Sequence, residues 1–413
     1  MRRLFAALFA ASSLAAPTVA HAQEPTTKPE ARAAGEAVTR FAVDLYGALR
    51  DEQGNLFFSP TSLSAALAMT REGAKGETAA ELDKALHFPA RLAPGQAALL
   101  EALRPREVTE WDEQGHQKKV PAYELAVANA LWGQQGAPFL APFTATLETQ
   151  YDAPLQRLDF TDVAAARRRI NGWVEERTRQ RIKDIVPEGK PSPDTRLVLA
   201  NAIYFKAAWQ DPFEKEDTKD APFHATGGDV QAKLMRRVDH LSYAADDAVQ
   251  VLSLPYRGDA TSLLVILPKR RDGLAAVEAG LTAERLAGWL GALKHTKVDV
   301  RLPRFEVTKA VDAKDVLQRL GVRRAFDGEA ADFSGMLESE RLFVGAVLHK
   351  AFVAVDEAGT EAAAATIVSM EAGSAPAPET PVDFVADHPF LFLIRHEPTG
   401  AVLFMGRLAT PAK

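Results

Sequence analysis

The stretch from Asp356 to Glu371 constrains the fold more than any other part of the chain. Its four consecutive alanines favour a helix by intrinsic propensity, yet it lies between strand-like sequence and a Gly/Pro/Ala-rich tail running to Pro381. From Thr360 to Met370, every second residue is uncharged. The residues between them include Glu361 and Glu371, so in a strand both charges would lie on the same face. A strand with this pattern could bury one face and leave the other in water. The sequence therefore predicts a loop that is able to become a strand.

Hydrophobic periodicity separates helices from strands along the rest of the chain. Apolar residues recur at helical spacing over 34–50, and Ser59-Pro60, which can cap a helix and fill its first turn, opens a second helix that ends near Gly73. Helices are also expected over 78–87 and 163–180, and strands over 123–132, 196–206, 249–254, 262–267, 297–305, 342–356, 390–396 and 402–407. Helices dominate early and strands late, without a strand–helix–strand rhythm. This order predicts an α+β fold with largely antiparallel sheets in a single large domain.

The N-terminus has the features of a secretory signal. Arg2 and Arg3 precede an apolar run from Leu4 to Ala16, and Ala20-His21-Ala22 supplies an A-x-A cleavage site, so we expect residues 1–22 to be removed before Gln23. The run is too short to span a membrane, which needs about 20 apolar residues. Residues 23–33 are expected to be a flexible segment and 34–413 the folded domain. The protein is therefore predicted to be secreted, into a periplasm or out of the cell, with no membrane contact.

Composition and motifs exclude several classes of function. The chain has no cysteine, which rules out disulfides and thiol catalysis, and its net charge of −6 gives no reason to expect nucleic acid as a partner. It contains no nucleophile elbow, zinc-protease helix, P-loop or dinucleotide fingerprint. The cell-adhesion tripeptide Arg257-Gly258-Asp259 lies in a predicted hairpin turn and is interpreted as a chance match. We expect no enzyme, no cofactor and no metal site.

Six motifs resemble those of the serpin family of serine protease inhibitors, in family order from about residue 35 to the end. The most specific is the hinge D-E-A-G-T-E-A-A-A-A-T, which has an acidic residue, Gly-Thr and then small side chains. The others are N-L-F-F-S-P-T-S-L-S-A-A-L-A-M (55–69), L-A-N-A-I-Y-F-K-A-A-W (199–209), L-H-K-A-F (348–352), F-V-A-D-H-P-F-L-F-L-I-R (384–395) and L-F-M-G-R-L (403–408). The chain is thus similar to serpins and is expected to be a secreted, bacterial-type member.

The resemblance implies a fold and a mechanism. Helices would pack on three largely antiparallel sheets, and a reactive-centre loop, about residues 357–383, would be exposed. In serpins a protease cleaves this loop, forms an acyl-enzyme and is trapped when the loop inserts as a new central strand. The implied partner is a target protease in a covalent complex with a monomeric inhibitor.

The resemblance also assigns roles to individual residues. Glu357 starts the hinge and is expected to pair with Arg304 where the sheet first opens. A polar cluster beneath the sheet, which must re-pair as the strands part, is expected from Ser59, Ser62, Asn201 and His349. The hinge residues are Glu357, Gly359, Thr360, Glu361, Ala362, Ala363, Ala364, Ala365 and Thr366.

The position of the cleaved bond is left open between two candidates. The family's usual spacing of sixteen residues from Glu357 places it at Gly373-Ser374, although the loop is about five residues longer on its C-terminal side. Met370-Glu371 is the alternative, because glycine offers a protease little to grip. No Lys or Arg occurs between Lys350 and Arg395, so a trypsin-like target, which needs a cation in its primary pocket, is not expected. Elastase-, chymotrypsin- or subtilisin-like enzymes fit this loop better, and a papain-like protease remains open.

The competing interpretation is a non-inhibitory serpin that acts as a carrier, chaperone or storage protein. Such members usually have bulky, charged or proline residues in the hinge. Here residues 360–366 follow the family's inhibitory pattern, which favours inhibition.

Overall fold

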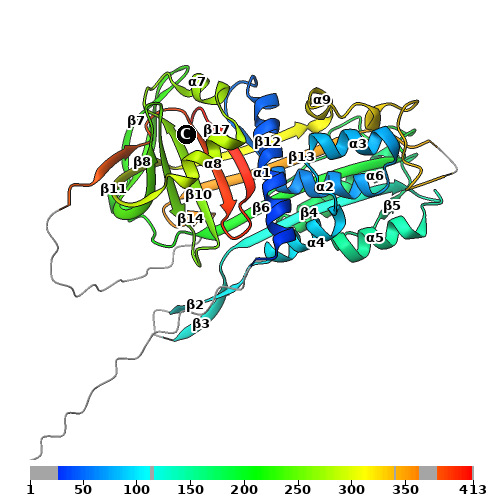
Figure 1. Ribbon diagram of the computed structural model, residues 1–413, viewed down its shortest axis with the longest axis horizontal. Helices are drawn as coiled ribbons and strands as arrows, with labels where there is room; N and C mark the ends of the chain where they lie inside the picture. Colours follow the sequence, from blue (N-terminus) through cyan, green and yellow to red (C-terminus); the bar gives the residue numbers. More distant parts are fainter. Residues whose placement is uncertain (1–26, 112–115, 339–340, 362–378, 412–413) are drawn as a thin grey trace, which may run out of the picture.

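The computed structural model describes residues 27–111, 116–338, 341–361 and 379–411, with helices concentrated in the first half of the chain and strands in the second (Figure 1). The helices are α1 (Pro29–Leu49), α2 (Pro60–Glu72), α3 (Gly76–Ala85), α4 (Leu92–Ala102), α5 (Ala141–Tyr151), α6 (Val163–Arg177), α7 (Leu274–Ala279), α8 (Ala283–Gly291) and α9 (Ala313–Arg319), with the short 3-10 helices η1 (Lys215–Asp217) and η2 (Arg324–Phe326). The strands are β1 (Leu56–Phe58), β2 (Glu107–Trp111), β3 (Gln117–Pro121), β4 (Glu124–Gln134), β5 (Gln156–Leu158), β6 (Leu197–Ala208), β7 (Lys219–Ala225), β8 (Gly228–Ala245), β9 (Val249–Pro255), β10 (Thr261–Pro268), β11 (Lys294–Pro303), β12 (Phe305–Asp312), β13 (Val347–Asp356), β14 (Gly359–Thr360), β15 (Val382–Val385), β16 (Phe390–His396) and β17 (Ala401–Leu408).

The strands form three sheets within the described residues. One has nine strands in the order β1-β17-β16-β10-β9-β8-β11-β15, with β7 beside β8, and another has six in the order β12-β13-β14-β6-β4-β5. The ribbon β2-β3 projects from the body (Figure 1). Neighbouring strands are mostly antiparallel, and the parallel pairs are β11–β15, β13–β6 and β4–β5. The prediction of a single α+β domain with three largely antiparallel sheets is confirmed.

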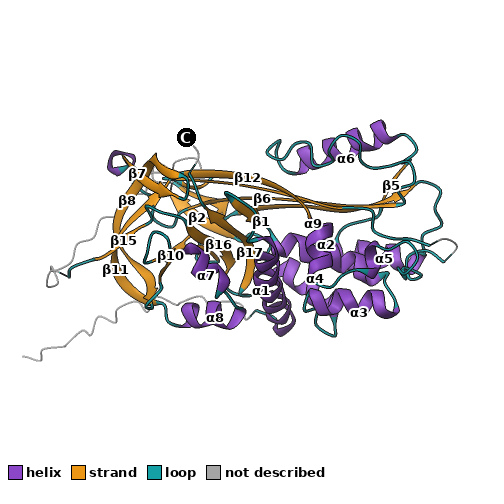
Figure 2. Ribbon diagram, turned by 90° about the horizontal axis from the view of Figure 1, so that it is seen from above, coloured by secondary structure: helices purple, strands orange, loops and turns teal. Residues whose placement is uncertain are grey.

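Helices cover both faces of the six-stranded sheet. Figure 2 shows α6 on one face and α2 to α5 on the other. The segment that follows α6 also packs on the α6 face, because Ile182, Ile185 and Val186 share a buried cluster with Tyr204 and Phe352 of the sheet. Any rearrangement of β6 and β13 therefore takes place beneath α6 and this segment.

Most expected elements appear within a few residues of their predicted bounds, with three differences. Helix α1 begins at Pro29, so the last part of the expected flexible segment 23–33 is helical; Pro29 fills the first turn, and Ala31 and Ala34 bury their side chains. The strand expected over 342–356 begins only at Val347, where pairing with Leu199 of β6 starts, next to the point where β12 ends at Asp312 opposite Leu348. The strand expected over 297–305 ends at Pro303, and the chain changes sheets at Arg304.

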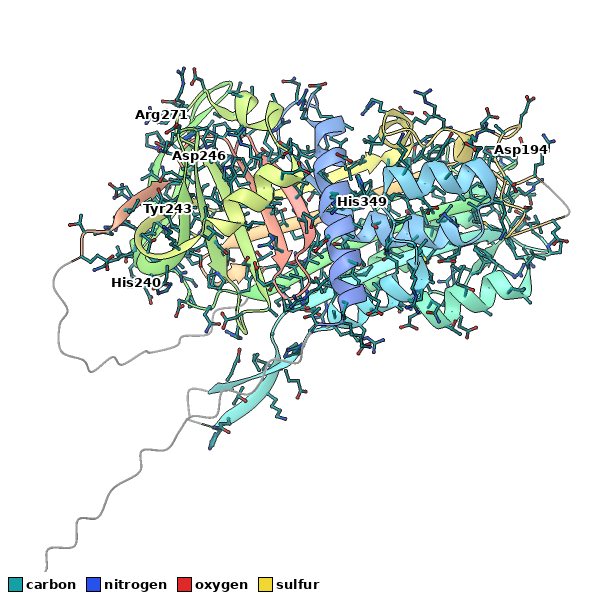
Figure 3. All side chains as sticks on the ribbon, in the orientation of Figure 1. Asp194, His240, Tyr243, Asp246, Arg271 and His349 are labelled. Carbon is teal, nitrogen blue, oxygen red and sulfur yellow. The ribbon has the colours of Figure 1, made fainter. Side chains whose placement is uncertain are left out.

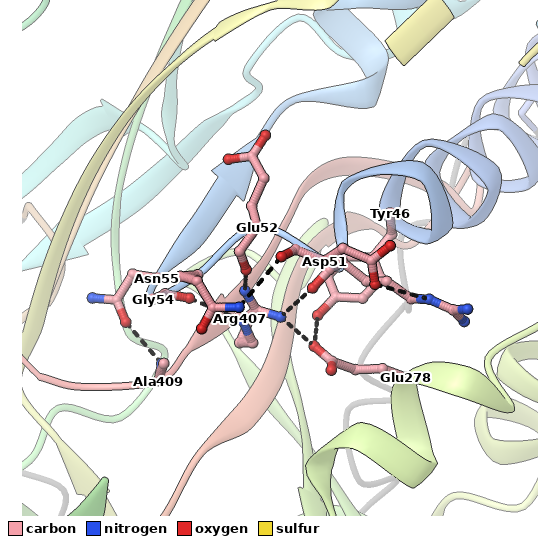
Figure 4. Close-up of polar contacts among 10 residues, drawn as sticks. Tyr46, Asp51, Glu52, Gly54, Asn55, Glu278, Arg407 and Ala409 are labelled. Carbon is pink, nitrogen blue, oxygen red and sulfur yellow. Dashed lines mark hydrogen bonds and ion pairs between the residues drawn. The ribbon is translucent and has the colours of Figure 1, made fainter. Parts of the chain in front are cut away.

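A buried arginine near the C-terminus ties β17 to the end of α1 (Figure 4). Arg407 donates to the backbone oxygens of Arg50 (2.9 Å) and Glu52, and it forms an ion pair of 2.8 Å with Glu278. The Tyr46 hydroxyl donates to the same carboxylate. Burial and the nearby Glu278 raise the Tyr46 pKa well above its usual value. One guanidinium thus satisfies carbonyl groups that the end of a helix leaves free.

Candidate functional site

The residues that follow β13 fold back into the six-stranded sheet. After a turn in which the Asp356 carboxylate accepts from the amides of Ala358 (2.9 Å) and Gly359 (3.2 Å), β14 lies between β13 and β6 and pairs antiparallel with both. Gly359 has φ +149°, and a Cβ there would lie 2.1 Å from the carbonyl oxygen of Ala207, so the position requires glycine. The expected exposed loop therefore begins with a turn at Glu357-Ala358 and a buried strand at Gly359-Thr360, so the expectation that the loop is exposed from Glu357 onward is wrong for these first residues.

Two aromatic rings hold β14 in the sheet. Trp209 stacks on Tyr256 with 4.6 Å between ring centroids, and its indole N–H donates to the carbonyl oxygen of Asp356 (2.9 Å). The Trp209 amide donates to the carbonyl oxygen of Ala358 (3.0 Å). The Tyr256 hydroxyl lies 2.5 Å from Thr360 Oγ1, and both residues are fully buried. These contacts hold the residues from Asp356 to Thr360 within the sheet.

The expected hinge ion pair is formed. Arg304 Nε lies 2.6 Å from the Glu357 carboxylate, and Thr218 Oγ1 donates to the same oxygen at 2.5 Å. Glu357 is only 3% exposed. Burial alone would raise the Glu357 pKa, but hydrogen bonds from Thr218 and Arg304 outweigh it and hold the pKa below its ordinary value. The carboxylate is thus kept ionised at the end of β13.

The four residues of the expected polar cluster meet beneath the six-stranded sheet. His349, labelled in Figure 3, accepts the backbone N–H of Ser59 at Nε2 (3.0 Å), so its proton is on Nδ1, which donates to Asn201 Oδ1. Burial lowers the His349 pKa to about 3. Asn201 Nδ2 donates to Ser62 Oγ (2.7 Å), and Ser59 Oγ caps α2 by accepting from the Ser62 amide (3.1 Å). His349 is therefore held neutral at ordinary pH.

A fifth member of the cluster, Asn129, was not predicted. Asn129 of β4 pairs directly with Asn201 of β6, which pairs in turn with His349 of β13, so the three form a polar row across the sheet. Asn201 Nδ2 donates to Asn129 Oδ1 (2.5 Å), as does Ser62 Oγ (3.0 Å). The sequence does contain a signal for Asn129, because it is the one polar residue among the alternating residues Leu125, Val127, Asn129 and Leu131.

The remaining predicted loop residues are only partly placed. Glu361 is the last hinge residue that the structure describes; Ala362, Ala363, Ala364, Ala365 and Thr366 lie outside the described residues, as do both candidate bonds, Gly373-Ser374 and Met370-Glu371. The chain is described again from Glu379, and β15 then pairs parallel with β11. The two described ends of the loop therefore belong to different sheets (Figure 1).

Other candidate sites give no support for a different chemistry. Arg257 of the adhesion-like tripeptide is paired with Glu110. Within the described part of the chain, no group of three His, Cys, Asp or Glu side chains is arranged to hold a metal ion. Over the same residues, no helix combines the length and apolar character needed to cross a membrane.

Comparisons with known proteins agree on one family. A family model described as "Serpin (serine protease inhibitor)" matches residues 36–411. Human Serpin B3 is 40% identical over 393 residues, which cover 91% of this chain and 99% of that protein. The leukocyte elastase inhibitor of Bos taurus is also 40% identical, over 388 residues that cover 91% and 98%.

Solved structures agree as well. Serpin48 of the insect Tenebrio molitor has a TM-score of 0.80 and 30% identity, covering 93% of this chain and all of that one. Human thyroxine-binding globulin, solved as a complex with thyroxine, has a TM-score of 0.81 and 28% identity, with the same coverage. All four of these proteins are from animals, so the expectation of a bacterial-type member finds no support here.

Proposed function

The chain belongs to the serpin family, and from that membership we propose that it is a secreted suicide inhibitor of proteases. A target enzyme cleaves the loop after β14 and forms an acyl-enzyme, and the loop then inserts between β13 and β6, carrying the enzyme with it. The protein itself catalyses no reaction. Its partner is the trapped protease, bound covalently to one inhibitor chain.

The observation that carries the proposal is the position of β14. It already occupies the space between the ends of β13 and β6, whereas further along these two strands pair directly with each other, beginning with Phe352 opposite Tyr204. Insertion of the loop would lengthen a strand that has already begun. The even-numbered residues from Thr360 onward are small or uncharged, which suits the buried side on which Thr360 itself lies.

The register of β14 specifies where later loop residues would arrive. Thr360 pairs with Val355 on one side and with Ala207 on the other. Six residues further along the loop and six residues back along each neighbouring strand, residue 366 would come between His349 and Asn201. Those two residues form the hydrogen bond that insertion must break. The Thr366 hydroxyl can both donate and accept, so it can bridge them.

The energy available is sufficient for the mechanism. An inserted strand of about 14 residues would be roughly 45 Å long. At about 1 kcal/mol net for each hydrogen bond, insertion would release on the order of 10 kcal/mol. This is comparable with the stability of a whole domain, so it can compete with the forces that hold a protease active site together.

The loop composition favours elastase-, chymotrypsin- or subtilisin-like targets over trypsin-like ones, because residues 351–394 contain no Lys or Arg. The names of the relatives include an elastase inhibitor, which agrees with this choice. The signal-like N-terminus supports secretion, to a periplasm or to the outside of the cell.

The test is to mix the purified protein with elastase, chymotrypsin, subtilisin and trypsin, followed by denaturing gels and intact-mass analysis. We expect a detergent-stable adduct with one of the first three, and a released peptide that begins at Ser374 or at Glu371. Clean cleavage by every protease without an adduct, and without a rise in melting temperature, would contradict inhibition. The carrier function would then take its place, since thyroxine-binding globulin shares the fold.

A further inference from the structure

The point where β14 ends and direct pairing of β13 with β6 begins is here called the fork. Its first direct pair is Phe352 of β13 opposite Tyr204 of β6. If the loop is to enter the sheet, this is the first pair that must separate. Contacts at the fork would therefore control the first step of insertion, so their role depends on the proposed function.

Glu361 turns the chain away from the sheet at the fork. Its amide still donates to the carbonyl oxygen of Ala354 (2.9 Å), in register with the ladder, but its φ of +51° is left-handed, which a non-glycine residue adopts only at some cost. Continuing the strand would require Glu361 to become extended. This residue is thus the switch between the inserted and the free part of the loop.

The Glu361 side chain is buried rather than solvated. It is 10% exposed, and burial raises the pKa of its carboxyl group. The Tyr204 hydroxyl lies beside the carboxylate, and the ion-pair partner is Arg181. A buried carboxylate without a partner is strongly unfavourable, so Arg181 is what makes this position of Glu361 tolerable.

Arg181 belongs to the segment that follows α6, on the face of the sheet that α6 covers. Its amide donates to the carbonyl oxygen of Thr178 (3.0 Å), and the next residue, Ile182, is fully buried. The guanidinium carbon lies 5.8 Å from the centroid of the Phe352 ring. One side chain, on a fixed backbone, thus contacts both the switch residue Glu361 and one member of the first pair at the fork.

We propose that Arg181 clamps the fork, by neutralising Glu361 and covering Phe352, and that it thereby sets the rate at which β13 and β6 separate to admit the loop. Arg181 is a positioning residue in this mechanism. Separation of Phe352 from Tyr204 disrupts the contacts by which Arg181 holds Glu361 and Phe352 together. Removal of Arg181 therefore lowers the cost of opening the fork.

The experiment measures insertion without any protease. A fluorescein-labelled peptide that copies residues 362–373 is incubated with the full mature chain, and its incorporation is followed by anisotropy and native mass spectrometry. Because the Arg181 side of the ion pair is half exposed, we expect Arg181→Met to incorporate the peptide about fivefold faster than the wild type. Arg181→Lys, which keeps the charge, should fall between the two.

Two further variants test the cause. Arg179→Met removes a neighbouring arginine of the same segment, which pairs with Glu124 and not with the loop, and it should behave as the wild type. Glu361→Gln should be no faster than the wild type, since it removes the buried charge. In the Glu361→Gln background, Arg181→Met should change the rate less than twofold, because the two residues act as a coupled pair.

Three results would overturn the clamp: a wild-type rate for Arg181→Met, an equal acceleration by Arg179→Met, or an undiminished effect of Arg181→Met in the Glu361→Gln background. These failures differ from failure of the proposed function. If the peptide enters no variant and not the wild type either, the sheet does not admit a strand, and both the clamp and loop insertion are wrong.

Discussion

Acid should weaken the closed sheet through one residue, His349. Its pKa in the folded protein is about 3, whereas an unfolded histidine titrates near 6.5. A histidine with a lowered folded pKa contributes its full stability above the unfolded value, and that stability is lost as the pH falls toward the folded value. Each pH unit below 6.5 costs about 1.4 kcal/mol, so a change from pH 7 to pH 4.5 removes about 2–3 kcal/mol of the free energy of unfolding.

The structural cause is burial of the imidazole, whose Nε2 accepts the hydrogen bond of the Ser59 amide. A proton on Nε2 would leave that amide without an acceptor and place a charge in the core. The assay is urea unfolding of the wild type and of His349→Gln at pH 7 and at pH 4.5. The variant is less stable at pH 7, but its loss on acidification should be smaller by about 2–3 kcal/mol.

A parallel variant separates this effect from that of a second buried histidine. Burial lowers the His396 pKa to about 4, with a contribution from Arg106, so His396 adds a similar acid-dependent loss. His396→Gln should reduce that part and leave the His349 part intact. An identical loss in the wild type and in His349→Gln would refute the assignment of neutral His349 to the closed sheet.

Three other substitutions test the candidate site and the stability of the fold around it. Gly359→Ala should expel β14, because its Cβ would meet the Ala207 carbonyl; we expect a loss of about 1–3 kcal/mol in urea unfolding and cleavage by the target without an adduct. Thr366→Val should lower the stability of the cleaved, inserted form by about 1 kcal/mol relative to Thr366→Ser, measured by its melting temperature, because valine cannot bridge the polar row. Arg407→Met should cost about 3–5 kcal/mol in urea unfolding, since it leaves the buried Glu278 without its positively charged partner. Glu278→Gln in the same chain should restore part of this loss.

Local chemistry made much of the fold predictable from the sequence. Ser59 caps α2 and Pro60 fills its first turn, as their order indicates. The hairpin strands β16 and β17 are continuous apolar runs around a Pro-Thr-Gly turn, and they appear with nearly the expected bounds. By contrast, the ribbon β2-β3 and the long strand β8 were not expected. Neither has a regular buried face, since β3 is almost wholly exposed and β8 alternates only in part.

Some residues of the candidate site could be predicted from the sequence, and others could not. Glu357 and His349 lie within or beside short motifs, so a resemblance to a family can place them. The roles proposed for Asn129 and Arg181 rest on contacts that depend on strand register and on the path of the chain after α6. No pattern within the sequence encodes that register. Arg181, in particular, lies in a basic, exposed stretch that gives no local sign of its contact with Glu361.

The polar row of Asn129, Asn201 and His349 is difficult to explain as a device for stability alone. Apolar side chains of similar volume would hold a closed sheet at least as well, because a buried polar network gains little over its desolvation cost. A row of polar groups has an advantage only if its partners must change. In the proposed mechanism, separation of β13 from β6 would break the His349–Asn201 bond, and the register of β14 would bring the Thr366 hydroxyl to that point. The same polar groups would then have hydrogen-bond partners both before and after insertion. This would lower the free-energy barrier between the two states without destabilising either of them.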